Sequence, residues 1–85
     1  MTKTALVTGG TRGIGKAISL SLEAAGYTVV ANYAGNDEAA KAFAAETGIA
    51  AYKWSVADPD ACASGIAKVE AEVGPIDILI NNAGI

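Results

Sequence analysis

The stretch TGGTRGIG, residues 8–15, decides how this chain folds. It follows a short apolar run typical of a buried strand and leads directly into a segment with helical spacing. Its glycines have separate uses: Gly9 permits the sharp turn, Gly13 lets the backbone approach a ligand, and Gly15 lets the helix lie close to the strand. Free N–H groups at the helix start then face an anion, so the stretch predicts a phosphate-binding loop.

Outward from this loop, short apolar runs alternate with helical segments. We expect strands at 4–8, 28–31, 50–54 and 78–80, and helices at 14–25, from Asp37 to Gly48, and from Pro59 to Gly74. The strands are apolar runs rather than alternating ones, which favours a parallel sheet covered on both faces. Right-handed crossovers put the first two helices on one face, and they give the order 3-2-1-4 if the third crossover returns past the first strand. A flavodoxin-like order, 2-1-3-4, is the open alternative.

The helical spacing also predicts which positions face the sheet. In the first helix these are positions 14, 17, 18, 21, 22 and 25, and Lys16 faces solvent. In the second helix they are 40, 43, 44 and 47, and in the third 62, 66, 69 and 73. We expect Cys62 to be a buried small apolar residue and Trp54 to serve packing.

Length and composition exclude several classes of protein. At 85 residues and 52% hydrophobic, the chain holds one globular domain, residues 1–85. A net charge of −3 with no basic cluster argues against nucleic acid as a partner. There is no apolar run long enough for a membrane span. One Cys and no His predict neither an internal disulfide nor a metal site, and a cytoplasmic setting is the default.

The spacing of the loop separates it from two other phosphate-binding motifs. It reads G-x-x-x-G-x-G, whereas the standard dinucleotide fingerprint is G-x-G-x-x-G. From Gly10 to Lys16 it approaches the pattern of a nucleoside triphosphatase loop, but Ala17 stands where that motif needs a Ser or Thr hydroxyl for Mg²⁺. We therefore set the triphosphatase interpretation aside.

The end of the second strand lacks an acidic residue. Dinucleotide folds that prefer NAD place Asp or Glu there to bind the ribose 2′-OH. No acid lies between Gly26 and Asn36, so Asn32, Tyr33 and Ala34 leave room for a 2′-phosphate. Arg12 in the loop can supply positive charge. This pattern predicts NADPH rather than NADH as the cofactor.

The loop TGGTRGIG together with NNAG at residues 81–84 resembles the short-chain dehydrogenase/reductase family, whose motifs are TGxxxGxG and NNAG. The resemblance covers the whole chain but only the N-terminal third or so of such an enzyme. It implies a Rossmann-type three-layer α/β fold, with residues 1–85 as its N-terminal NAD(P)-binding segment.

Within the family, residues 32–40 and 77–85 are most similar to 3-oxoacyl thioester reductases. Acetoacetyl-CoA reductases of polyhydroxybutyrate synthesis come first, and reductases of the acyl-carrier-protein thioester come next. The resemblance implies NADPH as cofactor, an acyl-CoA or acyl-carrier-protein thioester as substrate, and a homotetramer.

The loop and the resemblance together assign a set of cofactor-binding residues. After the third strand the family usually has Asp-Val, where this chain has Ser55-Val56, so the adenine contact would come from a shorter, uncharged hydroxyl. The candidate residues are Gly9, Thr11, Arg12, Gly13, Ile14, Gly15, Asn32, Tyr33, Ala34, Ser55, Val56, Asn81, Ala83 and Gly84.

No candidate catalytic residue lies on this chain. The family reduces carbonyls with a Ser and a Tyr-x-x-x-Lys pair. The positions four residues after Tyr27, Tyr33 and Tyr52 hold Ala31, Asp37 and Val56. The group that protonates the nascent alkoxide is therefore missing, and we expect the chain by itself to be inactive. A non-catalytic dinucleotide-binding module is the alternative function.

Overall fold

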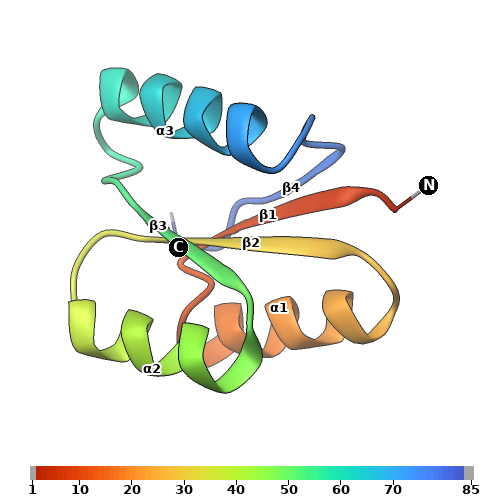
Figure 1. Ribbon diagram of the computed structural model, residues 1–85. Helices are drawn as coiled ribbons and strands as arrows, with labels where there is room; N and C mark the ends of the chain where they lie inside the picture. The colour runs from red at the N-terminus through yellow and green to blue at the C-terminus, as the bar shows by residue number, and fades with distance from the viewer. Residues whose placement is uncertain (1, 84–85) are drawn as a thin grey trace.

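The computed structural model describes residues 2–83, in which strands and helices alternate along the whole chain (Figure 1). The elements are β1 (Thr4–Thr8), α1 (Gly13–Ala24), β2 (Thr28–Tyr33), α2 (Asp37–Thr47), β3 (Ala50–Lys53), α3 (Pro59–Glu72) and β4 (Ile78–Ile80). The predicted order of elements is confirmed. Two strands end at residues other than those predicted: β2 continues to Tyr33, and β3 ends before Trp54.

The four strands form one parallel sheet in the order β3-β2-β1-β4. This order confirms the predicted 3-2-1-4 arrangement and excludes the flavodoxin-like 2-1-3-4 order. In the register, Thr8 lies opposite Asn32, and Tyr33 lies opposite Lys53. All four strands run the same way, so their carboxyl ends meet at one edge of the sheet (Figure 1). Ligands of such folds bind at that edge.

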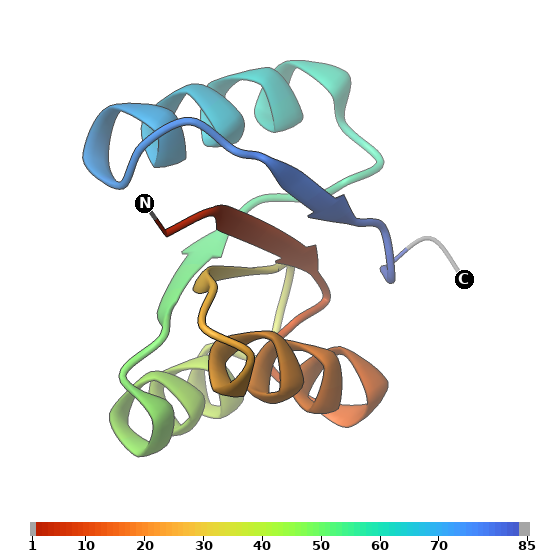
Figure 2. The same ribbon diagram turned by 90° about the vertical axis from the view of Figure 1, so that its right-hand side faces the viewer.

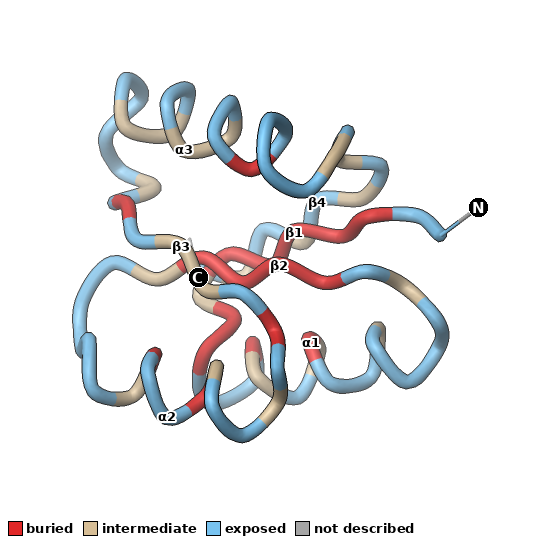
Figure 3. The backbone as a smooth tube through the Cα atoms, viewed as in Figure 1, coloured by how far each residue is buried: buried red, intermediate tan, exposed pale blue. Residues whose placement is uncertain are grey.

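Helices α1 and α2 cover one face of the sheet and α3 covers the other, which gives the predicted three layers (Figure 2). Successive strand residues point to opposite faces, so two apolar clusters form. The α1/α2 side buries Val7, Val29, Ala31, Phe43 and Ile49. The α3 side buries Leu6, Val30, Trp54 and Val69. The most buried backbone runs through β1 and β2, in the middle of the sheet (Figure 3).

The predicted inward face of α1 is confirmed at Ile18 and Leu22, which pack against the apolar cluster on this side of the sheet, and is wrong at positions 14, 17, 21 and 25, which are exposed. Gly15 and Ser19 are the buried residues of this helix, with Ile18 half-buried, whereas Ile14 is 73% exposed. A Cβ at position 15 would overlap the carbonyl oxygen of Gly9. This close contact at Gly15 and the packing of Ile18 and Leu22 together set the rotation of the helix.

Helix α3 approaches the sheet at a glycine. A Cβ at Gly65 would overlap the indole ring of Trp54, which is 7% exposed, so the ring lies against bare helix backbone. The expected packing role of Trp54 is confirmed. Cys62 is only half-buried, contrary to expectation, and its Sγ lies 3.5 Å from the carbonyl oxygen of Val56.

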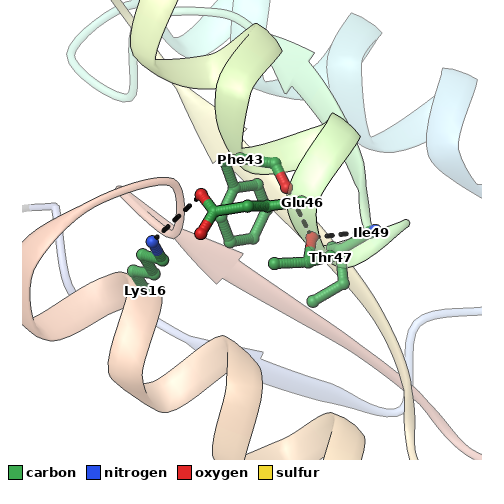
Figure 4. Close-up of polar contacts among 5 residues, drawn as sticks. All are labelled: Lys16, Phe43, Glu46, Thr47 and Ile49. Carbon is green, nitrogen blue, oxygen red and sulfur yellow. Dashed lines mark hydrogen bonds and ion pairs between the residues drawn. The ribbon is translucent and has the colours of Figure 1, made fainter.

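An ion pair joins α1 and α2, the two helices that cover the same face of the sheet. The helical spacing predicts that Lys16 faces solvent, but its Nζ lies 3.5 Å from a carboxylate oxygen of Glu46 on α2 (Figure 4). In the last turn of α2 the Thr47 hydroxyl donates to the Phe43 carbonyl at 2.7 Å and accepts from the Ile49 amide at 3.1 Å. The ion pair therefore joins the first turn of α1 to the last turn of α2, whose backbone groups are hydrogen-bonded by Thr47.

Candidate functional site

The loop between β1 and α1 depends on its glycines in different ways. Gly9 and Gly13 adopt left-handed conformations, with φ of 63° and 59°, which other residues resist. Apart from its chain neighbours and the backbone of its own helix, no described atom lies within 4 Å of a Cβ placed at Gly13, and the residue is exposed. The loop is thus closed toward the sheet at Gly15 and open outward at Gly13.

Helix α1 begins without the side chain that usually satisfies a helix start. Its N-cap, Arg12, has extended backbone, and within the described chain its side chain accepts no amide proton. The first helical hydrogen bond runs from the Lys16 amide to the Arg12 carbonyl at 3.2 Å. The amides of Gly13, Ile14 and Gly15 therefore have no partner within the helix. Together with the helix dipole, they form a positively polarised surface.

The other two helices begin differently. At α2, Asn36 Oδ1 accepts from the Ala39 amide at 3.1 Å. At α3, Asp58 Oδ1 accepts from the amides of Asp60 and Ala61 at 3.0 and 3.2 Å. The first turns of these helices also carry acidic residues, whereas that of α1 carries none.

The segment after β4 is bonded to the loop from the other side. Thr8 Oγ1 accepts from the Ala83 amide at 3.0 Å and lies 3.3 Å from the Ile80 carbonyl oxygen and 3.4 Å from Asn81 Oδ1. Asn82 Nδ2 donates to the Gly9 carbonyl at 3.4 Å. The structure thus brings Asn81 and Ala83 beside the glycine loop, while the predicted Gly84 lies outside the described residues.

Ser19, a buried serine of α1, is hydrogen-bonded to the glycine loop. The apolar spacing of the sequence does not predict its burial. Ser19 Oγ lies 2.9 Å from the Gly15 carbonyl oxygen and 3.1 Å from that of Gly10, where its hydroxyl can donate. The Gly10 amide in turn donates to the Asn32 carbonyl at 3.1 Å. Thr11, a predicted site residue, is buried in the same loop. These bonds join the loop to α1 and to the end of β2.

At the end of β2 the predicted residues separate into buried and exposed ones. Asn32 is buried, and its Nδ2 donates to the Trp54 carbonyl at 3.0 Å, so its side chain joins β2 to the end of β3. Tyr33 is half-buried and Ala34 is exposed. Beyond β3, Ser55 is exposed and its Oγ accepts from the Ala57 amide at 3.2 Å. The half-buried Val56 follows it.

The charged groups nearest to Tyr33 form an ion pair. Lys53 Nζ lies 3.2 and 3.3 Å from the two carboxylate oxygens of Asp37. Chiefly through this hydrogen bond and charge, Lys53 lowers the pKa of Asp37, and the Tyr33 side chain adds to the effect. Asp37 is ionised at neutral pH, as an ordinary aspartate is, and its lowered pKa keeps it ionised at more acidic pH.

Two further structural findings concern residues 2–83. No group of three or more His, Cys, Asp or Glu side chains comes together in this part of the chain as a metal would require. None of its helices is both long enough and apolar enough to cross a membrane.

The chain is similar in sequence to known proteins along nearly all of its length. The sequence pattern of the short chain dehydrogenases matches residues 3–85. An acetoacetyl-CoA reductase of Paracoccus denitrificans is 72% identical over 85 residues, which is all of this chain and 35% of that protein. The 3-oxoacyl-acyl-carrier-protein reductase FabG of Staphylococcus aureus is 46% identical over 90 aligned residues, covering all of this chain and 37% of that protein.

A solved structure shares both fold and sequence with the chain. It is a blue fluorescent protein from a metagenomic library in complex with NADPH, which is 37% identical with a TM-score of 0.87 over 98% of this chain and 36% of its own. The chain thus spans about a third of the length of the proteins that it matches. Since the family pattern covers nearly every residue, the chain belongs to the short-chain dehydrogenase/reductase family.

Proposed function

We propose that this chain is the cofactor-binding part of an NADPH-dependent 3-oxoacyl thioester reductase, with acetoacetyl-CoA as the preferred substrate. The reaction reduces the 3-keto group to a 3-hydroxyacyl thioester. The acetoacetyl-CoA reductase of Paracoccus denitrificans supports the CoA thioester through its 72% identity. The acyl-carrier-protein thioester, acted on by the less similar FabG, is the second candidate. The family resemblance extends the proposal to a cytoplasmic homotetramer.

The observation that carries the proposal is the start of α1. Among the three helices, only α1 lacks a side-chain cap within the described chain, and only its first turn lacks an acid. The backbone at Gly13 is open to a ligand, while Ser19 and Asn82 hold the loop in place. A diphosphate accepts hydrogen bonds from such amides and is favoured by the helix dipole. The loop therefore fits the diphosphate of a dinucleotide.

Each group of candidate residues has a role in this proposal. In this proposal the amides of Gly13, Ile14 and Gly15 bind the diphosphate, and the family resemblance assigns Ser55 and Val56 to the adenine. Asn81 and Ala83 border the loop on the side of β4. The cofactor itself supplies the hydride. The proton donor is absent from residues 1–85, which contain no Tyr-x-x-x-Lys sequence.

The preference for NADPH is assigned to the end of β2. Arg12 is exposed in the loop and carries the positive charge that a 2′-phosphate needs. β2 ends at Tyr33 and Ala34 follows it, and neither is acidic, so no carboxylate at these positions would repel a 2′-phosphate.

Two measurements test the proposal. NADPH and NADH affinities of the wild type and of Tyr33→Asp should show that the wild type prefers NADPH and that the variant prefers NADH, because its carboxylate repels the phosphate and binds the 2′-OH. An unchanged preference would refute this cofactor assignment. NADPH oxidation with acetoacetyl-CoA should show no turnover by residues 1–85 alone. Turnover that survives repurification would contradict the absence of the proton donor.

A further inference from the structure

The register of the sheet brings a lysine next to the position proposed to face the 2′-phosphate. Lys53 lies directly opposite Tyr33 in the pairing of β2 with β3, and the Trp54 amide donates to the Tyr33 carbonyl at 3.0 Å. From there the Lys53 ammonium extends to Asp37 in the first turn of α2, 3.2 and 3.3 Å from its carboxylate oxygens. Tyr33, Asp37 and Lys53 thus form one cluster at the carboxyl end of β2.

Asp37 creates an electrostatic difficulty for the proposed cofactor. The end of β2 has no acidic residue of its own, but the fold brings the carboxylate of Asp37, at the start of α2, close to it. A carboxylate at that place favours a ribose 2′-OH and repels a 2′-phosphate. The carboxylate is ionised at neutral pH, as an ordinary aspartate is, and Lys53, with smaller effects of Tyr33 and Lys41, lowers its pKa further. Glu38, the next residue, is exposed and adds negative charge.

We propose that Lys53 is a specificity-determining residue that permits NADPH to bind by neutralising Asp37. The inference rests on the proposed function, because it concerns the cofactor preference of that same site. The two side chains are 53% and 61% exposed, so an arriving phosphate can reach both of them. Without Lys53, the carboxylate of Asp37 would stand uncompensated beside Tyr33 and take the place of the acid that β2 lacks.

The test compares NADPH and NADH affinities of three variants with those of the wild type at low salt. Lys53→Met should weaken NADPH binding about two- to fivefold, the range for exposed charge pairs, and leave NADH binding unchanged or slightly stronger. Lys53→Met combined with Asp37→Asn should restore NADPH binding, since the charge that needed neutralising is gone. All differences should shrink in 1 M salt, where charges are screened within about 3 Å.

Lys68→Met is the matched control. Lys68 lies on α3, on the opposite side of the sheet, with its ammonium 5.8 Å from the centre of the Tyr52 ring. Its loss changes the net charge as Lys53→Met does and should leave both affinities unchanged. An equal loss of NADPH binding in Lys68→Met would mean that only net charge matters, which would overturn the role of Lys53.

The remaining outcomes separate the inference from the proposed function. If the wild type does not prefer NADPH, the cofactor assignment fails and the role of Lys53 fails with it. If the wild type prefers NADPH and Lys53→Met keeps that preference, the role of Lys53 alone is refuted. If Lys53→Met binds NADPH weakly and Asp37→Asn does not restore binding, neutralisation of Asp37 is refuted and Lys53 contacts the phosphate directly.

Discussion

Helices α2 and α3 begin with Asn36 and Asp58, whose oxygens accept the first free amide protons, whereas α1 begins at Arg12, which accepts none within the described chain. A side-chain cap stabilises a helix by about 1 kcal/mol. The chain uses this stabilisation at two helices and forgoes it at the third. The uncapped start of α1 also follows the glycine loop and is bordered by the segment after β4. An anionic ligand that accepts hydrogen bonds from helix amides requires amides that no side chain has capped.

The largest expected effect comes from closing the glycine loop. Gly15→Ala adds a Cβ that would overlap the carbonyl oxygen of Gly9. The overlap cannot be relieved by moving a flexible side chain, because the carbonyl is a backbone group and the Cβ is fixed to the backbone. We expect a loss of about 3 kcal/mol or more in the free energy of unfolding, together with loss of dinucleotide binding. Urea denaturation measures the first and NADPH titration the second.

Gly35→Ala is the control for that variant. A Cβ at Gly35 would have no described atom within 4 Å, and the residue does not need a left-handed backbone. The urea midpoint and NADPH affinity of Gly35→Ala should equal those of the wild type. A Gly15→Ala protein as stable as Gly35→Ala would show that the close approach to Gly9 is not needed.

A second prediction gives α1 the kind of cap that α3 has. The Arg12 backbone is extended, as an N-cap requires, so Arg12→Asp can accept from the amides of the first turn. Thermal or urea unfolding without ligand should show unchanged or slightly higher stability, by up to about 1 kcal/mol.

In the same variant, NADPH affinity should fall by about 10- to 100-fold, because the carboxylate occupies the amides and repels the phosphates. Arg12→Gln, which removes the charge without adding a carboxylate, is the control and should lose less. Equal NADPH affinity in Arg12→Asp and the wild type would mean that these amides are not the diphosphate site.

A third prediction removes a cap from a helix that has one. Asp58→Ala deletes the acceptor of the Asp60 and Ala61 amides and should lower the free energy of unfolding by about 1 kcal/mol. NADPH affinity of the folded protein should not change. Asp58→Asn, which keeps an oxygen acceptor, should recover most of the stability, and a failure to do so would argue that the cap acts through its charge alone.

The smallest effect concerns the pH dependence of the α2 start. Lys53 lowers the pKa of Asp37 below its ordinary value. The pair's contribution to stability is therefore complete above the pKa of the unfolded chain and is lost as pH falls through the lower pKa of the folded chain. The wild type should therefore lose slightly more stability than Asp37→Asn between pH 5 and pH 2. Urea midpoints across that interval measure the difference, and identical pH profiles would show that the pair is not stabilising.

The fold was predictable because its signals are local. Gly9 and Gly15 flank a turn that only glycine permits, and the apolar runs on either side have the lengths of strands and helices. The spacing predicted that Ile18 and Leu22 face the core, but not the burial of Ser19, which is polar and is bonded to the carbonyl oxygens of Gly10 and Gly15. Apolar periodicity cannot identify a buried hydroxyl whose partners lie in a loop.

The arrangement of the candidate site was predictable where it depends on the backbone of the glycine loop, and less so where contacts join distant parts of the chain. Thr8 meets Ala83, 75 residues away, and Lys53 meets Asp37, 16 residues away. Nothing in the local sequence around these residues marks them as partners. The register sets Lys53 opposite Tyr33, and the ion pair of Lys53 with Asp37 then brings an acid from α2 to the end of β2, which has none of its own.

Amide NMR shifts during titration with NADPH decide whether the free amides at the start of α1 are the diphosphate site. We expect the largest changes at the amides of Gly13, Ile14 and Gly15, with only small changes at Asp60 and Ala61, whose amides Asp58 already occupies. Saturating NADPH that leaves the three α1 amides unshifted, or that shifts the start of α3 as strongly, would contradict this assignment.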